Sequence, residues 1–166
     1  MNKREKEAML MQEFSKACYQ LETAGIKIGT VTKVSINTRA TNRWGRCVTR
    51  NGKSEIEISD LLFQSTNDGL IQTIIHELLH TIAPKDHHGG QWAVNADKMN
   101  RLYGYRIKNG DSFADVGVEE NIREERAKYK IVCDKCGHVF TYQRAGKVVQ
   151  HPEFYKCGCG GKLHKA

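Results

Sequence analysis

The chain has 166 residues, enough for one well-packed core and a small accessory module. No apolar run reaches the roughly 18 residues that span a membrane, and the charged start is unlike a signal peptide, so we expect an intracellular protein. The net charge of +7 is concentrated in residues 127–166, which carry eight Lys/Arg against two Asp/Glu and therefore suggest a polyanionic partner.

The first half of the chain predicts a helix followed by a small sheet. Apolar residues recur at helical spacing over residues 4–24, and Gly25 provides a C-cap. Residues 26–36 alternate β-branched and polar positions, as strands do. Residues 43–58 read as a hairpin, because Asn51-Gly52 favours a tight turn with positive φ. The pattern is typical of an α+β fold with a small, three-stranded, mainly antiparallel sheet packed with helices.

The stretch His76-Glu77-Leu78-Leu79-His80 lies inside an apolar run and predicts a buried helix, capped by Asn67-Asp68. Residues four apart share a helix face, so both histidines can bind one ion. Glu77 is turned away from this pair but can accept a proton from a water that the metal polarises. This is the H-E-x-x-H arrangement of zinc metalloproteases. A chance match is the alternative, although burying these groups without a metal would be costly.

A catalytic zinc ion needs three protein ligands and one open position, so a third ligand must come from outside this helix. The helix is expected to stop by Pro84, and the loop that follows carries His87 and His88. Either histidine could complete the site, as could a more distant acid such as Glu119 or Glu120. Two exposed loop histidines with no ligand role are the alternative.

A third helix is predicted over residues 91–102, ending at Gly104. Residues 105–126, with a charged second half, are interpreted as a connector. We therefore place a first domain at residues 1–104, the connector at 105–126 and a separate module at 127–166.

The C-terminal module contains two cysteine pairs with 20 residues between them, Cys133/Cys136 and Cys157/Cys159. In a reducing compartment this spacing favours a structural zinc ribbon over disulfides. The second pair is one residue shorter than a regular knuckle, so His151 or His164 could replace one thiolate. A redox-active first pair is the alternative, but it leaves the second pair unexplained.

The same module combines basic and aromatic residues, a mixture that can hold phosphates and stack unpaired bases. We therefore expect DNA, in single-stranded form, as a partner. Some of the aromatic residues must instead form the small core, and a merely solvated basic face is the alternative. The candidate contacts are Lys130, Lys135, Tyr142, Arg144, Lys147, Tyr155, Lys156 and Lys162, with Tyr129, Phe140 and Phe154 as further aromatic residues.

Three stretches together resemble the SprT-like metalloproteases, the family that includes Spartan, the DNA-dependent protease of DNA-protein crosslink repair. They are the hairpin from Asn42 to Ser59, the helix from His76 to His80, and His88-Gly89-Gly90-Gln91-Trp92. The likeness covers residues 8–104 and resumes at 129–163. It departs from the family pattern at Gln91, where many relatives carry Glu, and in the short loop after His80.

The resemblance implies a zinc-dependent endopeptidase that acts on DNA-bound or DNA-crosslinked proteins and is cytoplasmic, nucleoid-associated, or nuclear if eukaryotic. It selects His88 over His87 as the third zinc ligand and assigns a second, structural zinc ion to the four cysteines. The oxyanion-stabilising residue stays open among Tyr103, Tyr105 and Arg46. The competing hypothesis is a nucleic-acid-binding regulator whose first zinc site is structural.

Overall fold

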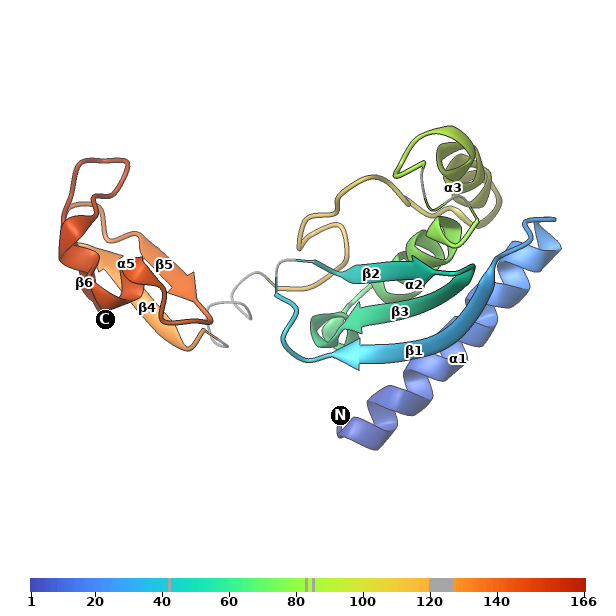
Figure 1. Cartoon of the computed structure of the whole chain (residues 1–166), viewed down its shortest axis with the longest axis horizontal. Coiled ribbons are helices and arrows are strands. Elements are labelled where there is room, and N and C mark those ends of the chain that lie inside the picture. Colours follow the sequence, from blue (N-terminus) through green and yellow to red (C-terminus); the bar gives the residue numbers. More distant parts are fainter. Residues whose placement is uncertain (42, 83, 85, 120–126) are drawn as a thin grey trace. The chain divides into compact units, whose positions relative to one another are not determined.

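The computed structural model describes residues 1–41, 43–82, 84, 86–119 and 127–166 (Figure 1). The chain divides into two compact units, Met1–Glu119 and Glu120–Ala166. Among the described residues, no helix is both long and apolar enough to cross a membrane.

The first unit opens with α1, Lys3–Thr23, which confirms the predicted first helix. Its N-terminus is fixed by a capping box, in which the Asn2 side chain accepts from the Glu5 backbone N–H and the Glu5 carboxylate accepts from the Asn2 N–H. Gly25 follows the helix at a φ of 68°, the left-handed conformation expected after a helix end.

The sheet of the first unit consists of β1 (Thr30–Asn37), β2 (Gly45–Arg50) and β3 (Lys53–Ser59), in the order β1-β3-β2. Strands β2 and β3 form the predicted hairpin around Asn51-Gly52, both with positive φ. Strand β1, however, pairs parallel to β3. The prediction of a mainly antiparallel sheet was therefore wrong for β1. Strand β3 lies between the other two strands and runs antiparallel to β2 but parallel to β1. The sheet is mixed, and β2 is one of its edges.

Helices cover one face of this sheet (Figure 1). After the short 3₁₀ helix η1 (Asp60–Gln64), α2 (Gly69–His80) packs against α1, β2 and β3. Its apolar side chains are almost entirely buried, and each such burial contributes about 1.5–3 kcal/mol. Helix α3 (Gly90–Tyr103) also packs on α2 and ends at Gly104 with a φ of 71°, as predicted. The core therefore fixes α2, the helix that carries both motif histidines.

Residues 105–119 belong to the first unit, although their sequence predicted a connector. Ile107, Val116 and Val118 are buried. The turn before Val118 is held by Thr66, whose backbone N–H donates to the Gly117 carbonyl over 2.8 Å. This segment thus forms part of the domain that carries the motif, and the predicted boundary at residue 104 falls too early. The rest of the predicted connector, residues 120–126, lies outside the described residues.

The second unit has β4 (Tyr129–Cys133), β5 (Val139–Tyr142), α5 (Lys147–Gln150), η2 (Pro152–Phe154) and β6 (Leu163–Lys165). Its strands form an antiparallel sheet in the order β5-β4-β6. The core is small and consists of Ile131, Cys133, Val149 and Leu163, with partly buried aromatic residues packed against it. Such a core is too small to account for stability by itself, which leaves a role for a metal.

Candidate metal centres and the adjoining pocket

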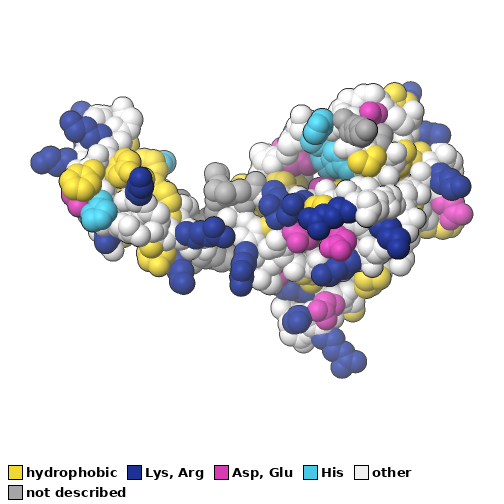
Figure 2. Space-filling model, viewed as in Figure 1, with side chains coloured by type: hydrophobic (Ala, Val, Ile, Leu, Met, Phe, Trp, Pro, Cys, Tyr) yellow, Lys and Arg dark blue, Asp and Glu magenta, His cyan; other side chains and the backbone are white. Residues whose placement is uncertain are grey.

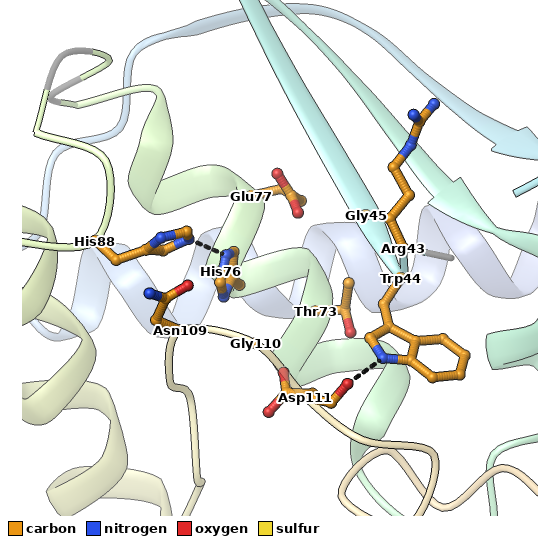
Figure 3. Close-up of a pocket in the computed structure, with 10 residues that line it drawn as sticks. All are labelled: Arg43, Trp44, Gly45, Thr73, His76, Glu77, His88, Asn109, Gly110 and Asp111. Carbon is orange, nitrogen blue, oxygen red and sulfur yellow. Dashed lines mark hydrogen bonds between the residues drawn. The ribbon is translucent and has the colours of Figure 1, made fainter. Parts of the chain in front are cut away.

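Three histidine side chains converge at one end of α2. His76 and His80 lie one helical turn apart. His88 approaches His76 from the loop before α3 (Figure 3). The His88 Nε2 atom lies 3.0 Å from the Nε2 of His76 and 3.2 Å from that of His80. The positions four residues apart on α2 thus share a face, as predicted, and the loop brings a third nitrogen to them.

Trp92, on α3, forms one side of this cluster. Its ring centroid lies 4.8 Å from those of His76 and His88 and 5.6 Å from that of His80. Its Nε1–H donates to the backbone carbonyl of His76 over 3.3 Å. The buried indole therefore restricts the orientation of all three imidazoles.

The three imidazoles are held in the neutral form that binds metals. Burial, followed by the His80 and His88 charges, lowers the pKa of His76 to about 3. Burial also lowers the pKa of His80 to about 4, and it lowers the pKa of His88 as well. Protonated imidazoles this close together would repel one another, whereas neutral imidazoles with converging nitrogens suit a metal ion.

The cluster fits a zinc ion. Zinc–nitrogen bonds of about 2.0–2.1 Å in a tetrahedral arrangement place the ligand nitrogens about 3.3 Å apart. The two Nε2 separations of 3.0 and 3.2 Å are close to that value. Three ligands from His76, His80 and His88 leave one tetrahedral position for water or substrate.

The other predicted candidates for the third ligand do not join this cluster. The His87 side chain is exposed, and its φ of 47° belongs to a turn. Glu119 is exposed and is not part of the histidine group, while Glu120 lies outside the described residues. Geometry among the described residues therefore favours His88.

We expect His88→Ala to lower the zinc content of the chain by about one equivalent, because a site with two protein ligands binds zinc weakly. His87→Ala is the matched control, since it removes the neighbouring imidazole and should leave the zinc content unchanged. Elemental analysis of both purified variants gives the answer. The reverse pattern would show that His87 is the ligand.

Glu77 lies beside the histidines and points into the same pocket (Figure 3). Burial raises the pKa of Glu77 to about 8, although the Arg43 charge and a hydrogen bond from the Cys47 backbone both lower it. Gly45 allows this position, because a Cβ atom there would overlap the Glu77 carboxylate. A carboxylate with a pKa near neutrality can both accept and return a proton.

The pocket around Glu77 has a volume of about 250 Å³. One wall comes from the start of β2 and the opposite wall from residues 109–111, in the segment that was interpreted as a connector. The lining residues are Arg43, Trp44, Gly45, Thr73, His76, Glu77, His88, Asn109, Gly110 and Asp111. The hairpin pattern did not mark residues 43–45 as pocket residues, although a glycine at a strand end signals close approach. Residues 109–111 could not be found from the sequence, because nothing local marks them.

The suggested oxyanion residues lie elsewhere. The Tyr103 hydroxyl donates to the Gln20 backbone carbonyl, and the Tyr105 hydroxyl bonds the Gln20 side chain. Arg46 is exposed, near Glu57, and does not line the pocket. Among the described residues that line the pocket, Arg43 is the one Arg or Lys.

In the second unit, the four cysteine sulfurs converge. The Sγ atoms of Cys133 and Cys159 are 3.5 Å apart, and those of Cys136 and Cys157 are 3.7 Å apart. A tetrahedral zinc ion with bonds of about 2.3 Å places its sulfurs about 3.8 Å apart. The shortened second pair therefore still brings both thiols to the site. His151 instead contacts Glu153, and neither His151 nor His164 joins the group.

The protonation of these thiols also suits a cation. Backbone hydrogen bonds, first from Cys136, lower the pKa of Cys133 to about 7. A backbone hydrogen bond from Gly161 lowers the pKa of Cys159, but the neighbouring sulfurs of Cys136 and Cys133 raise this pKa to about 12. A second thiolate beside the first thus needs a compensating positive charge, which zinc supplies.

The candidate DNA contacts of the second unit divide into two groups. Tyr142 packs against the small core, together with Tyr129 and Phe140. The others are exposed, and Tyr155 is 36% exposed. The Lys135 ammonium group donates to the Cys159 carbonyl. Lys and Arg side chains lie beside hydrophobic ones on this unit in Figure 2. The exposed group is Lys130, Lys135, Arg144, Lys147, Tyr155, Lys156 and Lys162.

No match was found among the curated proteins. The model of the SprT-like family matches residues 9–111, which include β2, α2, His88 and the 109–111 wall of the pocket. This match covers more than half of the sequence and confirms the resemblance inferred from its motifs: the chain belongs to the SprT-like family.

Proposed function

We propose that the chain is a zinc-dependent endopeptidase that acts on proteins bound or crosslinked to DNA. The observation that carries the proposal is the position of Glu77, a buried carboxylate that shares one pocket with the converging histidines. Membership of the SprT-like family supports a zinc metalloprotease-like domain. A purely structural zinc site would need neither a neighbouring buried acid nor an open position.

The residues of the pocket divide the work of peptide hydrolysis. His76, His80 and His88 would hold a zinc ion, which supplies Lewis acidity toward a water molecule and a peptide carbonyl. Glu77 takes a proton from the attacking water and gives it to the leaving amine. Strand β2 is a sheet edge beside the pocket, so an extended substrate can lie along it as an added strand.

The test is cleavage of an unfolded protein and of a DNA-binding protein by the full chain, with and without single-stranded DNA. We expect cleavage that a chelator abolishes and added zinc restores. Zinc binding and DNA binding without cleavage of any substrate would instead favour a nucleic-acid-binding regulator with a structural zinc site.

Gly45→Ala is expected to slow cleavage by about 10²-fold, because the new methyl group must displace the Glu77 carboxylate from its position. The measurement is kcat/KM on a peptide substrate, with zinc content determined in parallel. Gly146→Ala is the matched control, since no atom lies within 4 Å of the added Cβ and its φ of −71° suits alanine. Full activity of Gly45→Ala would mean that Glu77 needs no such close approach.

For DNA association, the second unit supplies both charge and an exposed aromatic surface. Phe154 is 77% exposed, and its ring stacks on His151 with centroids 5.6 Å apart. Tyr155 follows it in the chain and is also exposed. Planar rings beside exposed lysines suit a single strand, in which bases are free to stack. Phe154 and Tyr155 are therefore better candidates for base stacking than Tyr142, which packs against the core.

We expect Phe154→Ala to weaken binding of single-stranded DNA by about 1–3 kcal/mol while changing duplex binding little, since bases in a duplex are already stacked. Fluorescence anisotropy at two salt concentrations measures both. Tyr19→Ala is the control, because Tyr19 is an exposed aromatic residue of the first unit, at 69% exposure. Equal losses for the two DNA forms would argue against stacking.

A further inference from the structure

A hydrogen bond links the two walls of the pocket. The Trp44 Nε1–H donates to the Asp111 backbone carbonyl over 2.8 Å (Figure 3). The same indole meets the Phe113 ring edge-on, with centroids 4.8 Å apart and planes at 80°. Trp44 directly precedes β2, so it fastens the segment after α3 to the edge of the sheet.

The two ends of this segment have anchors of their own. On one side, the Asn100 side chain bonds both the N–H and the carbonyl of Ile107, over 2.7 and 3.0 Å. On the other side, Asp115 accepts from the Ser112 backbone and hydroxyl and pairs with Lys108 at 2.9 Å. Residues 109–111 span the gap between these anchors, all three line the pocket, and the Trp44 bond ties their last carbonyl to β2.

The segment also reaches the histidine cluster. The Lys108 backbone lies within reach of the His76 ring, and its carbonyl is the group that can accept from a ring N–H. The Nε2 atom of His76 faces His88, so Nδ1 is the nitrogen that the Lys108 carbonyl can hold. Groups that hold the far nitrogen of a metal-binding histidine fix its tautomer and orientation.

We propose that Trp44 is a positioning residue for the pocket: by holding the Asp111 carbonyl, it sets the distance between β2 and residues 109–111. Among the described residues, the hydrogen bond and the ring contact of Trp44 go to Asp111 and Phe113 rather than to the histidines or Glu77. For substrate, the contact with Asp111 keeps the width of the cleft fixed for an extended polypeptide. This part of the inference rests on the proposed endopeptidase function. The effect of Trp44 on zinc passes along the backbone from Asp111 to Lys108 and then to His76.

Trp44→Phe separates the hydrogen bond from the packing, because phenylalanine keeps a ring against Phe113 and lacks the donor. One net hydrogen bond is worth about 0.5–1.5 kcal/mol, so we expect KM for a peptide substrate to rise about 2- to 12-fold. The value of kcat should change less, since Glu77 is not displaced. We also expect zinc to leave the histidine site faster in chelator competition. The phase of zinc release that belongs to this site is the one that is missing in His88→Ala.

Phe113→Leu is the companion variant, because it removes the ring contact and keeps the Trp44 donor. It should shift KM and zinc release less than Trp44→Phe does, at equal thermal stability. If Trp44→Phe fails to fold, hydrogen exchange of the Trp44 indole N–H in the wild-type chain carries the test, and exchange as fast as in an unfolded peptide would overturn the proposal. Wild-type KM and zinc release in a folded Trp44→Phe would overturn it as well.

The zinc-release measurement also separates this inference from the proposed function. If the wild-type chain cleaves no substrate under any condition, the endopeptidase proposal fails. Faster zinc release from Trp44→Phe would still support the positioning role in that case, and unchanged release would refute it.

Discussion

The Glu77→Gln variant is expected to hold two zinc ions per chain and to cleave peptides about 10²- to 10⁴-fold more slowly than the wild type. The amide keeps the size of the carboxylate and most of its contacts beside Gly45, but it cannot accept a proton from water. Elemental analysis and kcat/KM on one peptide substrate measure the two parts of this expectation. A variant with full activity would remove Glu77 from the mechanism.

Glu57→Gln is the matched control for this experiment. Glu57 lies on β3 and pairs with Arg43 at 3.2 Å, so its replacement also disturbs an acid near the pocket arginine. Its pKa is lowered, first by the hydrogen bond from Asn37, which makes it a poor general base at neutral pH. Wild-type activity in Glu57→Gln would show that loss of activity in Glu77→Gln is specific to the buried carboxylate.

The parts of the fold that follow local rules could be predicted from the sequence. The spacing of His76 and His80 on one helix face depends on helical geometry alone. The β2–β3 hairpin depends on Asn51-Gly52, two residues that tolerate the positive φ observed there. These elements appear in the structure close to where the pattern placed them.

The arrangement of distant segments could not be predicted in the same way. Strand β1 pairs parallel to β3, and nothing in the alternation of residues 26–36 distinguishes that pairing from an antiparallel one. Residues 109–111 reach the pocket through anchors at Asn100, Trp44 and Asp115, which are separated from them by up to 67 positions. A polar, irregular segment looks like a connector when such contacts are unknown.

The aromatic residues of the second unit illustrate the same limit. Composition identified a mixture of core and surface rings but could not assign each residue. In the structure Tyr142 is partly buried and packs against the core, paired with Tyr129 across β4 and β5. Phe154 stays exposed on η2, a turn that packs against α5 and β6. The proposed base-stacking surface accordingly shifts toward Phe154 and Tyr155.

We expect Cys133→Ser to lose about one zinc ion per chain and to unfold residues 127–166 while the first unit stays folded. Cys133 combines two roles, because its sulfur belongs to the cysteine group and its side chain is only 2% exposed within the small core. Structural zinc contributes about 10–16 kcal/mol in zinc-finger peptides, far more than this core can replace. Amide NMR spectra and elemental analysis of the variant measure the two losses.

Cys18→Ser is the control, since Cys18 is a half-buried thiol of α1 outside both ligand groups. It should keep both zinc ions and a dispersed spectrum. Chelation of the wild-type chain should reproduce the Cys133→Ser spectrum for the second unit, and with it the loss of DNA binding. A second unit that stays folded after its zinc is removed would show that Ile131, Val149 and Leu163 stabilise it without a metal.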